Sequence, residues 1–97
     1  MDERTLTTKC IKKLRERGAF AVKIHGGPNQ PVGLPDIVGC YKGAFFGIEM
    51  KMPKKRNNLT EKQAKKLRDI QEAGGVTAVC TSVEEVLFVL SGIDDDD

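Results

Sequence analysis

Two carboxylates and an amine occur in a segment that otherwise has the composition of buried strand. Asp36 lies near the start of the stretch GLPDIVGCYKGAFFGIEMK, residues 33–51, and Glu49 and Lys51 lie at its end. Burying a carboxylate without a partner costs several kcal/mol, and one lysine can neutralise only one of the two. The trio therefore indicates either a three-membered salt bridge on a solvated sheet edge or a site for a divalent cation.

The turn between the two strands predicts how these side chains meet. If Lys42-Gly43 is a two-residue turn, the hairpin register places Asp36 directly opposite Glu49, with their Cβ atoms about 5 Å apart. Lys51, two residues beyond Glu49, then shares their face of the sheet. Hard oxygen ligands, few in number, suit Mg²⁺, which keeps several waters and often completes its shell with substrate phosphate.

Two predicted helices each add a polar residue at the end of an apolar stripe. Glu3 lies three residues before Leu6 on the first helix, and Gln63 lies four residues before Leu67 on the second. Solvated helix ends explain this pattern as well. Beside an acidic strand pair, however, the two residues indicate a shared polar pocket.

The hydrophobic periodicity predicts one α/β domain with the element order αβββαβα. The predicted helices are residues 3–17, 60–73 and 83–90, and the predicted strands are residues 19–25, 36–41, 44–51 and 76–80. We expect the domain to span residues 1–93. The acidic stretch 94–97 is expected to be a disordered tail.

The first predicted strand alternates between apolar and polar positions. Phe20, Val22 and Ile24 are expected to face the core, and Lys23 and His25 to face the other way. His25, the only histidine of the chain, is followed by a loop that leads to the strand pair. It is interpreted either as a structural or solvated residue or as a DNA contact.

The charge of the chain is unevenly distributed. The net charge is +2, but without the four terminal aspartates sixteen basic residues stand against ten acidic ones. Residues 51–68 contain eight basic residues and one acid, Glu61. Such a stripe is typical of a solvated face or of a surface that binds a nucleic-acid backbone. The predicted contacts are Lys54, Lys55, Arg56, Lys62, Lys65 and Lys66, together with Lys23 and His25.

The composition argues against membrane insertion and export. No apolar run approaches the ~18 residues that span a bilayer, and the N-terminus, MDERTLTTKC, lacks the apolar stretch of a signal peptide. Cys10, Cys40 and Cys80 are widely spaced within apolar patterns, which predicts reduced core thiols. We therefore expect a cytoplasmic protein, in a bacterium or a phage-infected cell.

The motif residues resemble a known nuclease signature. LPD at 34–36 and IEMK at 48–51 look like the PD-(D/E)XK pattern. Together with LTEKQAKKLRDIQEAGG, which contains Gln63, and with an acidic residue in the first helix, they resemble the VRR-NUC branch of that superfamily. The likeness covers roughly residues 3–90. The family core often ends a large repair nuclease, whereas here it stands alone, similar to phage or bacterial enzymes that cut branched DNA as dimers.

The resemblance implies a fold and a set of roles. The fold would be restriction-endonuclease-like, with an αβββαβ core, a mixed four-stranded sheet flanked by helices and a short C-terminal helix. Asp36 and Glu49 would bind Mg²⁺ or Mn²⁺ with the main-chain carbonyl of Met50, and Glu3 would reach the metal directly or through water. Lys51 would orient or deprotonate the attacking water, and Gln63 would position Lys51 or that water, so that Asp36, Glu49, Lys51 and Gln63 form the catalytic set.

These expectations combine into a metal-dependent, structure-selective DNA endonuclease that cuts four-way (Holliday) junctions as a homodimer. The alternatives are a non-catalytic nucleic-acid-binding module and a nuclease subunit that needs a partner protein. Apolar positions left over from the core, namely Phe88 and Val89 on the last helix and Phe45 beside Phe46, indicate a dimer interface. The residues do not separate DNA from RNA as the substrate.

Overall fold

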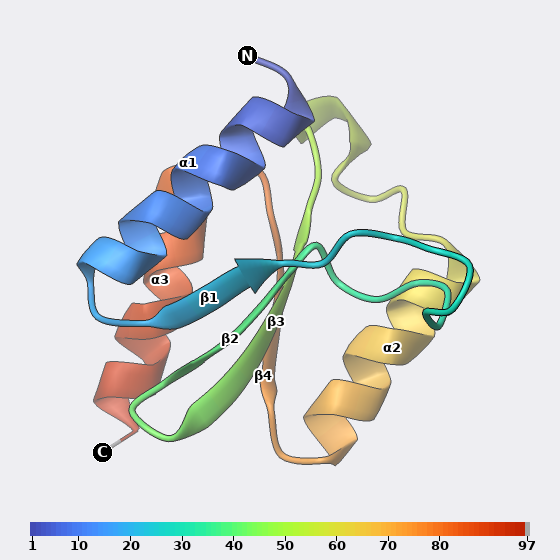
Figure 1. Ribbon diagram of the computed structural model, residues 1–97. Helices are drawn as coiled ribbons and strands as arrows, with labels where there is room; N and C mark the ends of the chain where they lie inside the picture. Colours follow the sequence, from blue (N-terminus) through green and yellow to red (C-terminus); the bar gives the residue numbers. More distant parts are fainter. Residues whose placement is uncertain (97) are drawn as a thin grey trace.

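The computed structural model describes residues 1–96 and has the predicted order of elements (Figure 1). The helices are α1 (Glu3–Glu16), the short 3₁₀ helix η1 (Pro53–Lys55), α2 (Glu61–Glu72) and α3 (Val83–Asp95), and the strands are β1 (Phe20–Lys23), β2 (Ile37–Tyr41), β3 (Ala44–Met50) and β4 (Val76–Cys80). Polar N-caps set the helix starts: the side chains of Asp2, Thr60 and Ser82 each accept a hydrogen bond from a main-chain N–H of the first turn.

The strands form one mixed sheet in the order β1-β2-β3-β4. The first three strands are antiparallel, and β4 is parallel to β3. Figure 1 shows α1 and α3 on one side of the sheet and α2 on the other. We call the side under α1 and α3 the core face and the side under α2 the open face. The predicted α/β fold with a mixed four-stranded sheet is confirmed.

The core face holds most of the buried apolar side chains. On β3, Phe46, Ile48 and Met50 are fully buried, and they pack with residues of α1 and α3 such as Leu14 and Leu90. On α2 only Leu67 is buried, with 8% of its surface exposed. The helix pair α1 and α3 therefore makes the main core, and α2 covers part of the second face.

The first strand faces the opposite way from the prediction. Ala21 is buried, with 1% of its surface exposed, whereas Phe20 is 66% exposed. Because α1 packs closely along β1, the small side chains of Ala19 and Ala21 fit beneath it, and the large ring of Phe20 is turned to the open face. The strand alternates as predicted, but the prediction of which residues face the core is wrong: Ala21 faces it and Phe20 does not.

Two further expectations are corrected near the chain's cysteines and C-terminus. Cys10 and Cys80 are buried as predicted, whereas Cys40 is exposed because it pairs with Phe20 on the open face. The last helix includes Asp94 and Asp95, although the sequence predicts that they belong to a disordered acidic tail. Asp94 accepts a hydrogen bond from the Tyr41 hydroxyl at 2.9 Å.

Residue 97, also part of the predicted tail, lies outside the described residues. On α3 itself, Val89 is buried rather than left over, while Phe88 is 76% exposed, as expected. None of the helices formed by the described residues is long and apolar enough to cross a membrane.

Candidate active site

The β2–β3 hairpin has the register that brings the two carboxylates together. Lys42 and Gly43 both have positive φ, +50° and +82°, as a tight two-residue hairpin turn requires. Ile37 pairs with Ile48, so the next step along the ladder places Asp36 opposite Glu49. The predicted facing pair is therefore confirmed at the level of strand register.

Asp36 is held by both neighbouring strands. Its Oδ2 accepts a hydrogen bond from the main-chain N–H of Met50 at 2.8 Å, and its Oδ1 accepts one from Lys23 Nζ at 3.2 Å. Its own carbonyl accepts from the N–H of Ile24 at 2.8 Å. Lys23, predicted as a DNA contact, thus also neutralises one carboxylate of the site.

Glu49 is a buried carboxylate, with only 4% of its surface exposed. Burial first, and then the nearby Asp36 carboxylate, raise the pKa of Glu49 from 4.5 to about 7, against the opposing effect of Lys51. Lys51 Nζ lies 3.7 Å from Glu49 Oε2. The fold therefore keeps a carboxylate where its charged form is disfavoured, which is typical of functional sites.

Gln63 joins the lysine, the glutamate and the start of α2. Its Nε2 donates to Glu49 Oε2 at 3.1 Å, and its Oε1 accepts from Lys51 Nζ at 3.3 Å. The same Oε1 accepts from the N–H of Thr60, and Thr60 Oγ1 accepts from the N–H of Gln63. This reciprocal capping box fixes the amide at the helix N-terminus and points it into the site.

The loop between β1 and β2 braces the same helix end. Gly33 has φ +91°, and a Cβ there would lie 2.7 Å from the main-chain carbonyl of Lys62 and 3.0 Å from the nitrogen of Gln63. Only glycine permits this approach. The sequence indicated a loop without regular structure here and gave no sign that it supports Gln63.

The donor set of the site fits a hard divalent cation. Two facing carboxylates, one of them buried, supply the oxygen ligands, and in this structure Lys23 and Lys51 balance their charge. Glu3 is exposed at the start of α1 and acts weakly on Glu49 through its charge. Within residues 1–96, no three His, Cys, Asp or Glu side chains form a ready metal cage, so water and substrate oxygens would complete the shell.

The predicted basic stripe is only partly available to a ligand. Arg56 donates to Thr81 and Glu85, which ties it to the start of α3, and Lys65 pairs with Asp69 at 3.1 Å. Lys54 and Lys55 are exposed on η1. Lys62 is exposed and Lys66 half-buried on α2, and His25 is exposed after β1.

Fold and site together define a class. The sheet is mixed and four-stranded, and Asp36 faces a Glu-x-Lys on the next strand. Gln63 of α2 is hydrogen-bonded to both Glu49 and Lys51. This is the arrangement of a PD-(D/E)XK-type nuclease. The chain belongs to the archaeal Holliday junction resolvase (Hjc) family, whose model matches residues 2–94. A search of curated proteins by sequence found no match.

A solved structure supports the fold. The 1.6 Å structure of Archaeoglobus fulgidus Hjc, a Holliday junction resolvase from an archaeal hyperthermophile, is similar with a TM-score of 0.56 and 20% sequence identity. The match covers 78% of this chain and 68% of that one. At this identity the likeness concerns the fold alone. The predicted superfamily is confirmed, while the VRR-NUC branch stays a prediction.

Proposed function

We propose that the protein is a metal-dependent endonuclease that cuts four-way (Holliday) DNA junctions with the site around Asp36 and Glu49. Membership of a Holliday junction resolvase family makes it a structure-selective, junction-cutting nuclease. The observation that carries the assignment to this site is the Glu49 carboxylate, which is buried beside Asp36 and bonded to Gln63. A binding module gains nothing from such a costly charge.

Asp36 and Glu49 would hold a cation such as Mg²⁺ or Mn²⁺, and the main-chain carbonyl of Met50 and the side chain of Glu3 are the further candidate ligands. A bound cation of this kind lowers the pKa of a coordinated water and offsets charge on a phosphate. The N–H of Met50 fixes one oxygen of Asp36, which leaves its other oxygen, now bonded to Lys23, to turn toward a ligand.

Lys51 supplies the positive charge nearest the buried carboxylate. Its side chain is 15% exposed, so its ammonium group acts with little screening by water. Gln63 holds that group at 3.3 Å, where it can orient an attacking water and stabilise the charge that builds on the phosphate oxygens. Gln63 is therefore the residue that sets the distance between Lys51 and Glu49.

The first experiment is a substrate panel. Labelled four-way, flap, duplex and single-stranded DNA would be incubated with the protein in Mg²⁺, in Mn²⁺ and in EDTA. We expect paired nicks in the four-way junction with either cation and none in EDTA. The alternative reading as a non-catalytic module predicts binding in all three conditions and no cleavage in any. A subunit that needs another protein would cut only after a cell extract is added.

A kinetic experiment tests Lys51 itself. Because its charge acts on the transition state, Lys51→Ala is expected to reduce single-turnover cleavage by about 10²–10³-fold, while junction affinity changes little. Neutralising Lys54 and Lys55 should do the reverse, weakening binding to all DNA alike. If the saturated Lys51→Ala complex cleaves at the normal rate, the role of Lys51 is wrong.

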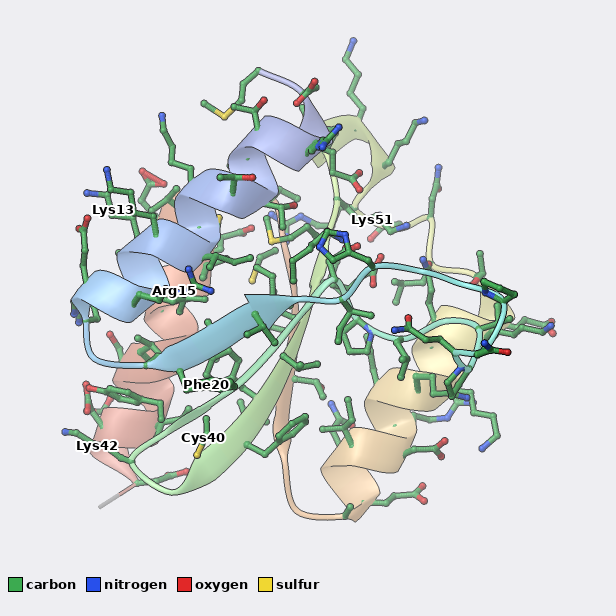
Figure 2. All side chains as sticks on the ribbon, viewed as in Figure 1. Lys13, Arg15, Phe20, Cys40, Lys42 and Lys51 are labelled. Atoms are coloured by element: carbon green, nitrogen blue, oxygen red, sulfur yellow. The ribbon has the colours of Figure 1, made fainter. Side chains whose placement is uncertain are left out.

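The homodimer is part of the same proposal, and the open face offers its surface. Phe20, Cys40 and Phe45 are cross-strand neighbours in one row, and all three are exposed. Figure 2 shows Phe20 and Cys40 side by side below β1. This row lies about 13 Å along β3 from Glu49, so a second copy seated on it leaves the site open. A twofold dimer would present two sites to the two symmetry-related strands of a junction.

Light scattering tests the interface. We expect a dimeric mass for the wild type and a monomeric mass for the double variant Phe20→Ser/Phe45→Ser. Phe88→Ser removes the exposed ring of α3 that the sequence also predicts for the interface; a monomeric Phe88→Ser protein beside a dimeric Phe20→Ser/Phe45→Ser protein would place the interface on α3 instead. A monomeric wild type would refute the dimer.

Dimers of wild-type and Asp36→Asn subunits should leave junctions nicked once. The narrower predictions of a VRR-NUC relative, a bacterial or phage source and a cytoplasmic location remain part of the proposal.

A further inference from the structure

A groove runs between α1 and the edge strand β1, away from the predicted basic stripe. It consists of two adjoining hollows of about 760 and 620 Å³, which share the lining residues Thr8, Ile11, Lys23 and His25. Because β1 is the first strand of the sheet, this edge has no neighbouring strand to fill it. The groove is therefore an open channel along one side of the molecule.

Basic side chains dominate the walls of this groove. The basic lining residues are Arg4, Lys12, Arg15, Lys23 and His25, and the acidic ones are Glu3 and Glu16. Glu16 Oε1 is already paired with Lys13 Nζ at 3.3 Å, and Lys13 itself is not part of the groove lining. The remaining charge is positive, and the lining contains no Phe, Tyr or Trp ring on which a base could stack.

One of these cations is fixed in place by the main chain. Arg15 Nε donates to the carbonyl of Ala21 at 3.1 Å, which holds the guanidinium at the groove wall. Figure 2 shows Arg15 between α1 and β1, whereas Lys13 points away from the sheet. A guanidinium held in this way loses less side-chain entropy when it binds a phosphate.

The groove continues into the active site through Lys23. Lys23 lines both hollows, and its Nζ lies 3.2 Å from Asp36 Oδ1. A third hollow of about 330 Å³, lined by the loop after β1, is bounded by Lys23 and Asp36 as well. A nucleic-acid strand that lies in the groove along α1 would therefore continue to the Asp36 carboxylate.

We infer that this groove binds the sugar–phosphate backbone of the DNA strand that continues from the cleaved phosphate, with Lys12 and Arg15 as phosphate contacts. The inference rests on the proposed function. It adds a second track to the stripe on η1 and α2, in which Arg56 and Lys65 are occupied by Glu85 and Asp69. The contacts are to phosphate, so binding here is independent of base sequence.

The test compares two double variants of α1 that remove the same charge. Lys12→Gln/Arg15→Gln removes two groove cations, and Lys9→Gln/Arg17→Gln removes two exposed cations of the same helix and its C-cap, outside the groove lining. Affinity for a labelled four-way junction would be measured by fluorescence anisotropy in EDTA between 50 and 300 mM salt, and cleavage separately in Mg²⁺.

We expect the groove variant to bind about tenfold more weakly at 100 mM salt and to lose about two units of the slope of log Kd against log salt. The control variant should change affinity by less than about twofold and keep the slope. The single-turnover cleavage rate at saturation should be unchanged in both. Equal weakening in the two variants, or an unchanged slope in the groove variant, would overturn the inference.

Arg15 also bonds to the main chain, so thermal unfolding of each variant is measured alongside. Should Arg15→Gln unfold, the single substitution Lys12→Gln, whose parent side chain lines the groove from an exposed position, carries the test with half the slope change. Failure of the groove inference can be told from failure of the proposed nuclease function, because binding is measured without metal and cleavage is measured with it. A wild type that binds the junction through the groove but never cuts it refutes the nuclease, not the groove.

Discussion

Strand β3 passes its side chains alternately to the two faces of the sheet, and the two sets differ in chemistry. Phe46, Ile48 and Met50 point to the core face and have no exposed surface. On the open face, the carboxyl group of Glu49 is buried, and Phe45 is 45% exposed. One face of a seven-residue strand thus resembles the centre of a protein, and the other resembles a binding surface.

The difference teaches how a small domain accommodates a costly site. A buried carboxylate lowers stability, and the apolar contacts of α1 and α3 on the core face offset that cost. On β3 the residues that stabilise the fold are therefore different from the residue that serves the active site. The even-numbered residues pack in the core, and Glu49 belongs to the site. Substitutions on the two faces should have opposite consequences, which the following predictions use.

The largest effect is expected on the open face. Asp36→Asn keeps an acceptor for the N–H of Met50 but removes a charge from the pair. We expect junction cleavage in Mg²⁺ to fall by about 10³-fold or more, because the affected charge acts in the transition state. Gel analysis of single-turnover cleavage measures it. Wild-type nicking by this variant would remove Asp36 from the site.

The second prediction concerns the core face. Phe46→Ala removes a ring with no exposed surface, and it should lower the free energy of unfolding by about 3–5 kcal/mol. Urea denaturation of the two proteins measures the difference. The fraction that remains folded should cleave at a normal rate. A folded but inactive Phe46→Ala protein would show that the two faces are not independent.

The third prediction is a dependence of stability on pH without divalent cations. The pKa of Glu49 is raised to about 7 in the folded protein from 4.5, so between these values the folded state binds more protons than the unfolded one. Stability should therefore be fully present below about pH 4.5 and should fall by at most about 3 kcal/mol as the pH rises to 7.

Urea unfolding at a series of pH values measures this loss. Glu49→Gln, which cannot ionise, is the control and should show a flatter profile than the wild type in the same window. Saturating Mg²⁺ should also flatten the wild-type profile, because a cation that binds the ionised pair favours the folded state. Identical profiles for the wild type and Glu49→Gln would contradict the raised pKa.

The smallest effect is expected at the cap of α2. Thr60→Ala removes the hydroxyl that accepts from the N–H of Gln63, and it should cost about 1 kcal/mol of stability. Because the cap also orients the Gln63 amide, cleavage should fall too, by less than in Lys51→Ala. Thr60→Ser keeps the acceptor and should restore both properties. A serine variant as impaired as the alanine variant would argue against the capping box.

The site was predictable from the sequence to the extent that local rules decide it. A two-residue turn fixes the register of a hairpin, and Lys42-Gly43 was enough to place Asp36 opposite Glu49. Helix periodicity likewise directed Gln63 toward the sheet, where it bonds to Glu49. The roles of Asp36, Glu49, Lys51 and Gln63 in catalysis stay predictions.

The rest depends on contacts between distant segments. Nothing in the residues around Arg56 reveals that Glu85, on α3, takes up its charge. The inward phase of β1 follows from how closely α1 packs on Ala21, and the groove along that edge follows in turn. Gly33 supports α2 through an approach that only the folded loop defines.

The opposition between the two faces is tested most directly by one pair of measurements on Glu49→Gln. Its free energy of unfolding would be determined by urea denaturation at pH 8 in EDTA, next to its cleavage of a four-way junction in Mg²⁺. If the Glu49 carboxylate lowers stability and serves catalysis, the free energy of unfolding of Glu49→Gln should exceed that of the wild type by at most about 3 kcal/mol. The same variant should not cleave the junction. A less stable variant, or one that cleaves at the wild-type rate, would contradict it.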